Sequence, residues 1–288
     1  MTTTAPAVDG PVLDDLDSRP GSTTSLLRTV VGSTLRERGG WMPTAALVAL
    51  MEAVDVPPAR TRTALSRVKA RGLLLAENRG GVAGYALSPA ALPMLERGDR
   101  RIHHPRTMRE GDPWGLVSFS LPERERDLRH QLRRRLGWMG CGTVTGALWI
   151  CPATLLDEVE AIVADLGLTE RVTLFVADEV RGVRDLREAV GRWWDLTAIA
   201  RLHAEFLARA GATGAAGATG ADRSGLGPRE AFHAWTIVLD SWRPIPYLDP
   251  GLPLTLLPDD WPARRSIPFF LEARDRVAAA ALEFARSV

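Results

Sequence analysis

The stretch PPARTRTALSRVKARG, residues 57–72, decides the fold of the N-terminal part of this chain. Proline suits the first turn of a helix, because its fixed φ and missing N–H cost nothing there. At about 100° per residue, a helix over this stretch places Thr61, Ala64, Leu65 and Val68 on one inward face. The opposite face is small, polar and cationic, so we predict a helix that presents basic side chains outward.

Two shorter helical patterns precede this stretch, and a hairpin pattern follows it. The first helix runs from Ser22 to Gly39, where two glycines stop it, and the second covers residues 43–53. The runs 73–77 and 82–87 flank a loop that contains two glycines, which is typical of a β-hairpin. Three helices followed by a hairpin predict a winged helix-turn-helix over residues 22–95.

A local charge excess favours DNA as the partner of this module. Residues 57–81 hold six basic side chains and one acid, Glu77, although the whole chain has a net charge of only +1. A helix fits the major groove of B-DNA, where arginine pairs with guanine, and flanking basic groups contact phosphates. We expect base contacts from Arg62, Thr63, Ser66 and Arg67, phosphate contacts from Arg60, Lys69 and Arg71, and minor-groove or backbone contact from Arg79. The alternative interpretation is an ordinary solvated basic helix.

The middle of the chain predicts a second module. A stretch rich in charges and turn formers, residues 96–112, indicates a linker between the two modules. Strand and helix patterns then alternate in the order βαββαβ, which is typical of a small ferredoxin-like domain over residues 113–182. The predicted elements are a strand at 114–121, a helix at 122–135, one or two strands at 142–150, a helix at 153–166 and a strand at 171–177.

The remaining residues, 183–288, predict a helical C-terminal domain. We expect helices at 186–194, 196–210, 232–242 and 266–286, with a proline-rich extended region at 244–262. The Gly/Ala/Thr-rich segment 211–228 is of low complexity, which predicts a flexible loop. The first 21 residues show no periodic pattern, so they are expected to form a disordered tail.

Composition excludes several classes of protein. The chain has 288 residues, of which 45% are hydrophobic and 25% charged, as in globular proteins of two or three domains. No apolar run approaches the roughly 20 residues of a membrane span, and the start lacks the features of a secretory signal. We therefore expect a cytoplasmic protein with no membrane partner. Cys141 and Cys151 lack metal-ligand spacing and are expected to be buried thiols.

Catalytic signatures are missing from the sequence. His103-His104 has no cluster of other metal ligands nearby, and no nucleophile, phosphate-cradling or metalloprotease motif is present. We therefore predict no catalytic residues, no metal and no resident cofactor. The arginine-rich helix at 123–135 is a second candidate for an anionic partner, but its charge gradient also follows the helix dipole, which favours a structural role.

Tryptophan is concentrated in the C-terminal third, interleaved with arginine. Such a set can build an apolar pocket with a cationic rim, suited to an aromatic or acyl ligand that carries phosphate or carboxylate. The alternative is a plain aromatic core. The candidate ligand-binding residues are Trp194, Trp235, Trp242, Arg243 and Trp261.

These residues resemble those of the PaaX family of transcriptional regulators. The likeness extends from about Ser22 to Phe284 and is carried by RTALSRVKARG at 62–72, GALWICP at 146–152, and DPGLP at 249–253 followed by LLPDDWP at 256–262. The resemblance implies a winged-helix DNA reader, a central domain similar to Cas2 and a helical C-terminal region. It also implies homodimers on near-palindromic operators, released by an acyl-coenzyme A such as phenylacetyl-CoA.

We therefore predict a ligand-responsive DNA-binding regulator, a repressor of a catabolic operon. One alternative is a metal-dependent nuclease that uses the Cas2-like domain, which needs a carboxylate at the end of the first strand. That strand reads Val117-Ser118-Phe119-Ser120 and has none. Another alternative is a regulator without a small-molecule effector. The chain departs from the family at 239–243, where LDSWR lacks a histidine that relatives often carry, and in the segment 211–228, so the departures concern the effector.

Overall fold

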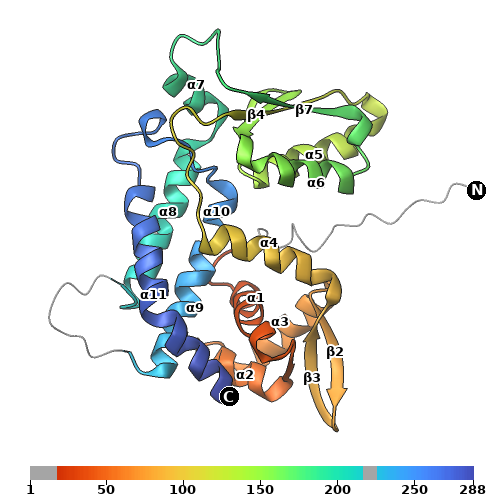
Figure 1. Cartoon of the computed structure of the whole chain (residues 1–288). Coiled ribbons are helices and arrows are strands. Elements are labelled where there is room, and N and C mark those ends of the chain that lie inside the picture. Colours follow the sequence, from red (N-terminus) through yellow and green to blue (C-terminus); the bar gives the residue numbers. More distant parts are fainter. Residues whose placement is uncertain (1–17, 217–225) are drawn as a thin grey trace, which may run out of the picture. The chain divides into compact units, whose positions relative to one another are not determined.

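The computed structural model describes residues 18–216 and 226–288 and shows an α+β protein, as predicted (Figure 1). Its strands form one three-stranded sheet and one four-stranded sheet. The chain divides into two compact units. The first comprises the described parts of Met1–Arg100, Glu205–Trp242 and Ile267–Val288, and the second comprises Arg101–Ala204 and Arg243–Ser266.

The first unit begins with the predicted winged helix-turn-helix. Its helices are α1 (Thr23–Thr34), α2 (Thr44–Glu52) and α3 (Pro58–Ala70), and its hairpin is β2 (Leu74–Arg79) with β3 (Val82–Leu87). A short strand, β1 (Trp41–Pro43), pairs antiparallel with β3 and completes the sheet in the order β1-β3-β2. The sequence did not indicate β1, because three residues are too few to show an alternating pattern.

The predicted inward face of α3 is confirmed. Thr61, Ala64, Leu65 and Val68 are all buried, at 3% exposure or less, and α3 packs against α1 and α2. The turn before α3 contains Asp55, whose φ of 61° makes it the one non-glycine residue with positive φ among those described. The packing of α3 against α1 and α2 fixes which side of α3 faces solvent.

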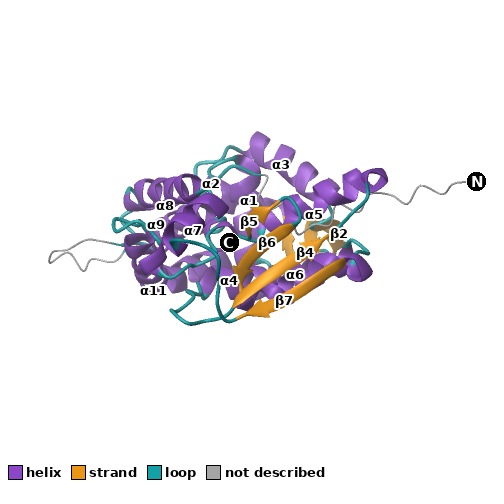
Figure 2. Ribbon diagram, turned by 90° about the horizontal axis from the view of Figure 1, so that it is seen from above, coloured by secondary structure: helices purple, strands orange, loops and turns teal. Residues whose placement is uncertain are grey.

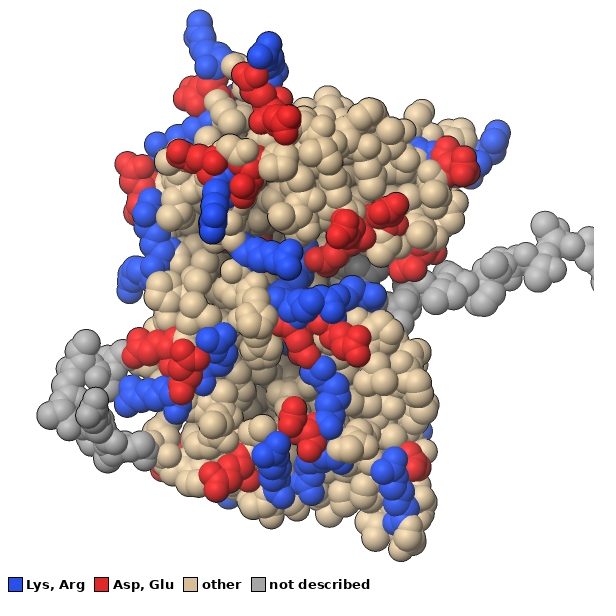
Figure 3. All heavy atoms as spheres, in the orientation of Figure 1, with Lys and Arg blue, Asp and Glu red and all other residues tan. Residues whose placement is uncertain are grey.

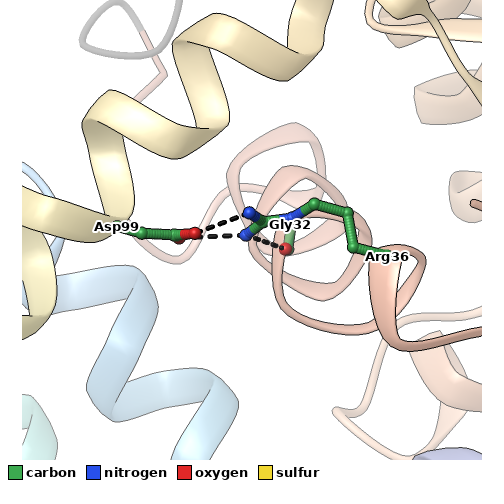
Figure 4. Close-up of polar contacts among 3 residues, drawn as sticks. All are labelled: Gly32, Arg36 and Asp99. Atoms are coloured by element: carbon green, nitrogen blue, oxygen red, sulfur yellow. Dashed lines mark hydrogen bonds and ion pairs between the residues drawn. The ribbon is translucent and has the colours of Figure 1, made fainter.

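A helix, α4 (Leu92–His103), replaces the first part of the expected linker at 96–112. Met94, Gly98 and Ile102 are buried on it at intervals of four, a stripe that the surrounding charges obscured in the sequence. Asp99 accepts two hydrogen bonds from Arg36, at 2.6 and 3.0 Å (Figure 4). The hydrogen bond to Asp99 raises the pKa of Arg36. The charges that suggested a linker therefore include one that attaches α4 to the segment just beyond α1.

Three helices of the C-terminal region contribute to the first unit: α8 (Leu196–Gly211), α9 (Pro228–Trp242) and α11 (Ala263–Ser287). Their aromatic side chains form a core, in which Trp242 stacks on Phe270 at 4.5 Å and contacts Phe206 at 5.1 Å between ring centroids. Both α9 and α11 begin a few residues earlier than predicted. Residues 217–225 of the expected flexible loop lie outside the described residues, as do residues 1–17 of the expected tail.

A buried carboxylate joins α9 to α1. Asp240 is 1% exposed and accepts hydrogen bonds from the Ser25 hydroxyl at 2.6 Å and the Thr29 hydroxyl at 3.0 Å. It also accepts one from the backbone N–H of Gly21 at 2.6 Å, so the last residues of the expected tail have a defined place. Because a buried acceptor must be satisfied, these donors fix the position of α1 along α9.

The second unit contains the predicted ferredoxin-like domain (Figure 2). Its sheet has the strand order β5-β6-β4-β7, with every neighbouring pair antiparallel. The elements are β4 (Trp114–Phe119), α5 (Arg126–Trp138), β5 (Gly142–Thr145), β6 (Leu148–Pro152), α6 (Leu156–Asp165) and β7 (Val172–Ala177). Side chains from β4, α5 and α6, including Val117, Leu132 and Val159, build its core. The unit also holds α7 (Leu186–Trp193) and α10 (Ile245–Leu248), the latter inside the region expected to be extended.

The two thiols are buried in this core, as expected. Cys141 is 5% exposed and Cys151 is fully buried. The hydrogen bond to Cys151, together with burial, raises the pKa of Cys141 well above its usual value. Cys141 therefore holds little thiolate at neutral pH, and both side chains are part of the packed core. Among the described residues, every helix falls short of the length and hydrophobicity that crossing a bilayer requires.

The carboxylate of Asp240 generates a testable prediction. In D240A the hydroxyls of Ser25 and Thr29 lose their acceptor, which costs about 2 kcal/mol for buried donors. We expect hydrogen exchange in peptides covering α1 to become about thirtyfold faster where local opening limits it. D240N keeps an acceptor oxygen and should lose less. The matched control is S33A, whose hydroxyl bonds only to carbonyls of its own helix. Unchanged exchange in D240A would contradict the role given to this carboxylate.

Candidate nucleic-acid interface

The outer face of α3 is exposed and cationic. All seven predicted contact residues on this helix and at its end lie at the surface: Arg60, Arg62, Thr63, Ser66, Arg67, Lys69 and Arg71. None of Arg60, Arg62, Arg67 and Lys69 forms an ion pair with any residue that the structure describes. An exposed cationic side chain without a protein carboxylate keeps its full charge for an anionic partner.

The two hydroxyls on this face already have hydrogen-bond acceptors. Thr63 donates to the carbonyl oxygen of Ala59 at 3.1 Å, and Ser66 donates to that of Arg62 at 3.2 Å. A hydroxyl has one donor and two acceptor lone pairs, so both side chains present acceptors outward in this arrangement. Such acceptors match the exocyclic amino groups of adenine and cytosine in the major groove.

The hairpin formed by β2 and β3, which we call the wing, places Arg79 beside an acid and an aromatic ring. Arg79 donates from Nε to Glu77 at 2.6 Å, and its guanidinium carbon lies 5.3 Å from the ring centroid of Trp41. The hydrogen bond from Arg79 lowers the pKa of Glu77, so this carboxyl is ionised at neutral pH. Unlike the basic residues of α3 named above, Arg79 is therefore paired. The sequence did not single out Trp41, which lies on the unexpected strand β1.

The basic helix α5 is engaged within its own unit. Arg129 donates to Glu123 at 2.7 Å, Arg133 donates to the carbonyl of Gly146, and Arg134 lies over the ring of Trp138 at 4.5 Å. These contacts favour the structural interpretation of this helix over a second binding patch. On the face drawn in Figure 3, basic and acidic side chains are interspersed rather than gathered into a field of one sign.

The five candidate ligand-binding residues are all buried and are divided between the two units. Trp235 and Trp242 stack on Phe270 in the first unit. In the second unit Trp194 donates to the carbonyl of Gly140 at 2.8 Å. Trp261 and Arg243 also belong to the second unit, at 3% and 8% exposure. Their role in ligand binding stays a prediction, and each of the four tryptophans also serves the packing of its own unit.

One set of buried, hydrogen-bonded polar side chains was not predicted from the sequence. His203 is fully buried, with Nδ1 at 2.6 Å from the Ser266 hydroxyl and Nε2 at 2.8 Å from the Asp249 carboxylate. These residue types perform nucleophilic catalysis in hydrolases. Here both the imidazole and the hydroxyl have zero exposure, so the arrangement ties α8 to the start of α11 and to the Asp-Pro-Gly turn. Among the described residues, no group of three or more His, Cys, Asp or Glu is placed to hold a metal ion.

Comparisons with known proteins agree along the chain. Family models match in three parts: "PaaX-like protein" at 22–91, "PaaX protein central Cas2-like domain" at 108–190 and "PaaX-like protein C-terminal domain" at 194–287. The Transcriptional repressor PaaX of Escherichia coli (strain K12) is 28% identical over 268 residues, which cover 92% of this chain and 83% of that protein.

A solved structure shares the fold. The uncharacterized protein Rv0674 from Mycobacterium tuberculosis is similar with a TM-score of 0.55 and 20% sequence identity, over 90% of this chain and 97% of that chain. At this identity the likeness concerns the fold alone. The three family models and the curated relative together cover both units, and they establish that the chain belongs to the PaaX family.

Proposed function

We propose that this protein is a transcriptional repressor that binds operator DNA through α3. The observation that carries the proposal is the outer face of α3, which holds four exposed cationic side chains without carboxylate partners in a chain of net charge +1. The relative named as a transcriptional repressor supports the same assignment. A basic helix after a tight turn and before a wing is the arrangement that enters a major groove.

Each side chain of the interface has a proposed task. Arg62 and Arg67 read guanine edges bidentately, while Thr63 and Ser66 accept from amino groups of neighbouring bases. Arg60, Lys69 and Arg71 contact phosphates, which position the helix without specifying sequence. In a homodimer, two copies of α3 enter successive major grooves about 34 Å apart, which requires a near-palindromic operator.

The proposed effector is an aryl- or acyl-coenzyme A that releases the DNA. Helix α9 connects the C-terminal region to the winged helix-turn-helix, so a ligand bound in the C-terminal region can act on DNA binding through α9. Its Asp240 holds α1, and its His233 lies 3.2 Å from Asp55 in the turn before α3. A ligand that favours another position of α9 shifts the orientation of the reader, and lowers operator affinity by its difference in binding energy between the two states.

Base reading by α3 is tested with matched substitutions. R62A and R67A should each weaken operator binding by about 1–3 kcal/mol and relax the base preference at one position. R62K keeps the charge but loses bidentate geometry, so it should relax base preference as well, whereas R60K should leave it unchanged. Binding titrations on the promoter of its own operon, with base-substituted variants, measure both quantities. R124A is the control, because Arg124 is a 79% exposed arginine of the second unit that lies outside α3. Equal binding by wild type, R62A and R67A would refute the assignment of α3.

The effector is tested by thermal shift and operator titration with the same compounds. A ligand selective for the native state raises the midpoint of unfolding, by an amount that grows with ligand concentration. We expect phenylacetyl-CoA or a related thioester to raise the midpoint and to weaken operator binding, and free coenzyme A to do neither. A panel of thioesters that changes neither quantity would support a repressor without a small-molecule effector.

A further inference from the structure

We propose that Trp41 and Glu77 are positioning residues that hold Arg79 on the outer face of the wing, and that the Glu77 carboxylate occupies the place which a DNA phosphate takes on binding. The inference rests on the proposed function, because it assigns part of the DNA contact to the wing. Its ligand is the phosphodiester backbone beside the groove that α3 enters. Two residues outside the predicted interface thereby become part of it.

Strand register puts the three side chains on one face. Glu77 lies opposite Gly84, Arg79 lies opposite Val82, and Trp41 pairs with Ala86 on the other side of β3. Side chains two apart on a strand share a face, as do directly opposed residues of neighbouring strands. Trp41, Glu77 and Arg79 therefore all project from the side of the sheet that faces away from the core residue Leu74.

The ring of Trp41 is held in place from two directions. A Cβ built on Gly84 would lie 2.6 Å from ring atom Cζ2 of Trp41, so only glycine lets the ring lie against this strand. The indole Nε1 also donates to the carbonyl oxygen of Glu77 at 3.4 Å. An aromatic ring fixed in this way offers its face to a cation, and the guanidinium carbon of Arg79 lies within cation–π range of it at 5.3 Å.

The Glu77 carboxylate accepts hydrogen bonds from the Arg79 guanidinium, as the oxygens of a phosphate would. Its two oxygens lie 2.6 Å from Nε and 3.4 Å from Nη2 of Arg79, so one edge of the fork faces the carboxylate. Arginine uses this same edge to bind carboxylate and phosphate alike. The side chains of Arg79 and Glu77 are 48% and 41% exposed. Water and salt therefore weaken the pair, and an incoming phosphate can replace the carboxylate at small cost.

The exchange gives Glu77 a second effect on binding. Its negative charge repels the DNA backbone and partly neutralises Arg79, so it lowers affinity for DNA of any sequence. Trp41 acts in the opposite direction, because it keeps the guanidinium in place after the carboxylate has moved away. Neither residue reads bases, so changes at either should affect operator and unrelated DNA alike.

The test compares wing variants on the operator and on unrelated DNA over a range of salt concentrations. R79A should weaken binding several-fold to both DNAs and reduce the slope of log K against log salt by about 0.9. W41A should weaken binding in the same way and add little in the R79A background, whereas W41F, which keeps a ring, should retain most of the affinity. E77Q should strengthen binding to both DNAs and steepen the slope. E52Q is the matched control, since it removes an exposed acid from the end of α2.

The outcomes separate this inference from the proposed function. If R62A and R67A weaken binding while W41A and E77Q behave as wild type and E52Q, then α3 reads DNA and the wing inference is wrong. Additive losses from W41A and R79A would also overturn it, because they would show that the ring acts without the guanidinium. If R62A and R67A leave binding unchanged, the proposed function itself fails. Circular dichroism and thermal unfolding check that each variant is folded. If W41A does not fold, the comparison of W41F with wild type still tests the role of the ring.

Discussion

Burial of one face of α3 is the constraint on which the DNA-binding account depends. Thr61, Ala64, Leu65 and Val68 are withdrawn from water against neighbouring helices, so rotation of α3 about its axis would expose apolar surface. At 3.6 residues per turn, the basic residues between them have only one direction left. The exposure of the cationic surface is therefore a consequence of packing and does not depend on a bound partner.

The position of the winged helix-turn-helix within the first unit depends on two carboxylates. Asp99 of α4 pairs with Arg36 just beyond α1, and Asp240 of α9 accepts from two hydroxyls along α1. These contacts differ in exposure and hence in energy. The Arg36–Asp99 pair is partly exposed, whereas Asp240 is almost completely buried, where loss of a partner costs more. Helix α9 is accordingly the firmer connection between the C-terminal region and the DNA reader.

Sequence patterns predicted those parts of the fold that depend on regular burial. The four-residue stripe of α3 and the order βαββαβ have clear periods, and both are present. The strand β1 and the helix α4 were not predicted. The strand is too short to show a period, and charged residues mask the buried stripe of the helix. The contacts of Asp240, Trp41 and His203 join segments far apart in sequence, and no local pattern reports such contacts. Exposure of the α3 residues was predictable, but the pairing of Arg79 with Glu77 and Trp41 was not.

Mapping DNA contacts from the face of α3 tests whether this helix lies against the operator. Both native thiols are buried, so a DNA-cleaving reagent can be attached selectively to a cysteine introduced at Ser66, with His130 on α5 as the comparison site. If α3 enters the major groove, the reagent at position 66 cuts only within the operator half-sites, and the reagent at position 130 makes no cuts there. Cleavage from position 130 with none from position 66 would show that DNA lies against another surface and would contradict binding through α3.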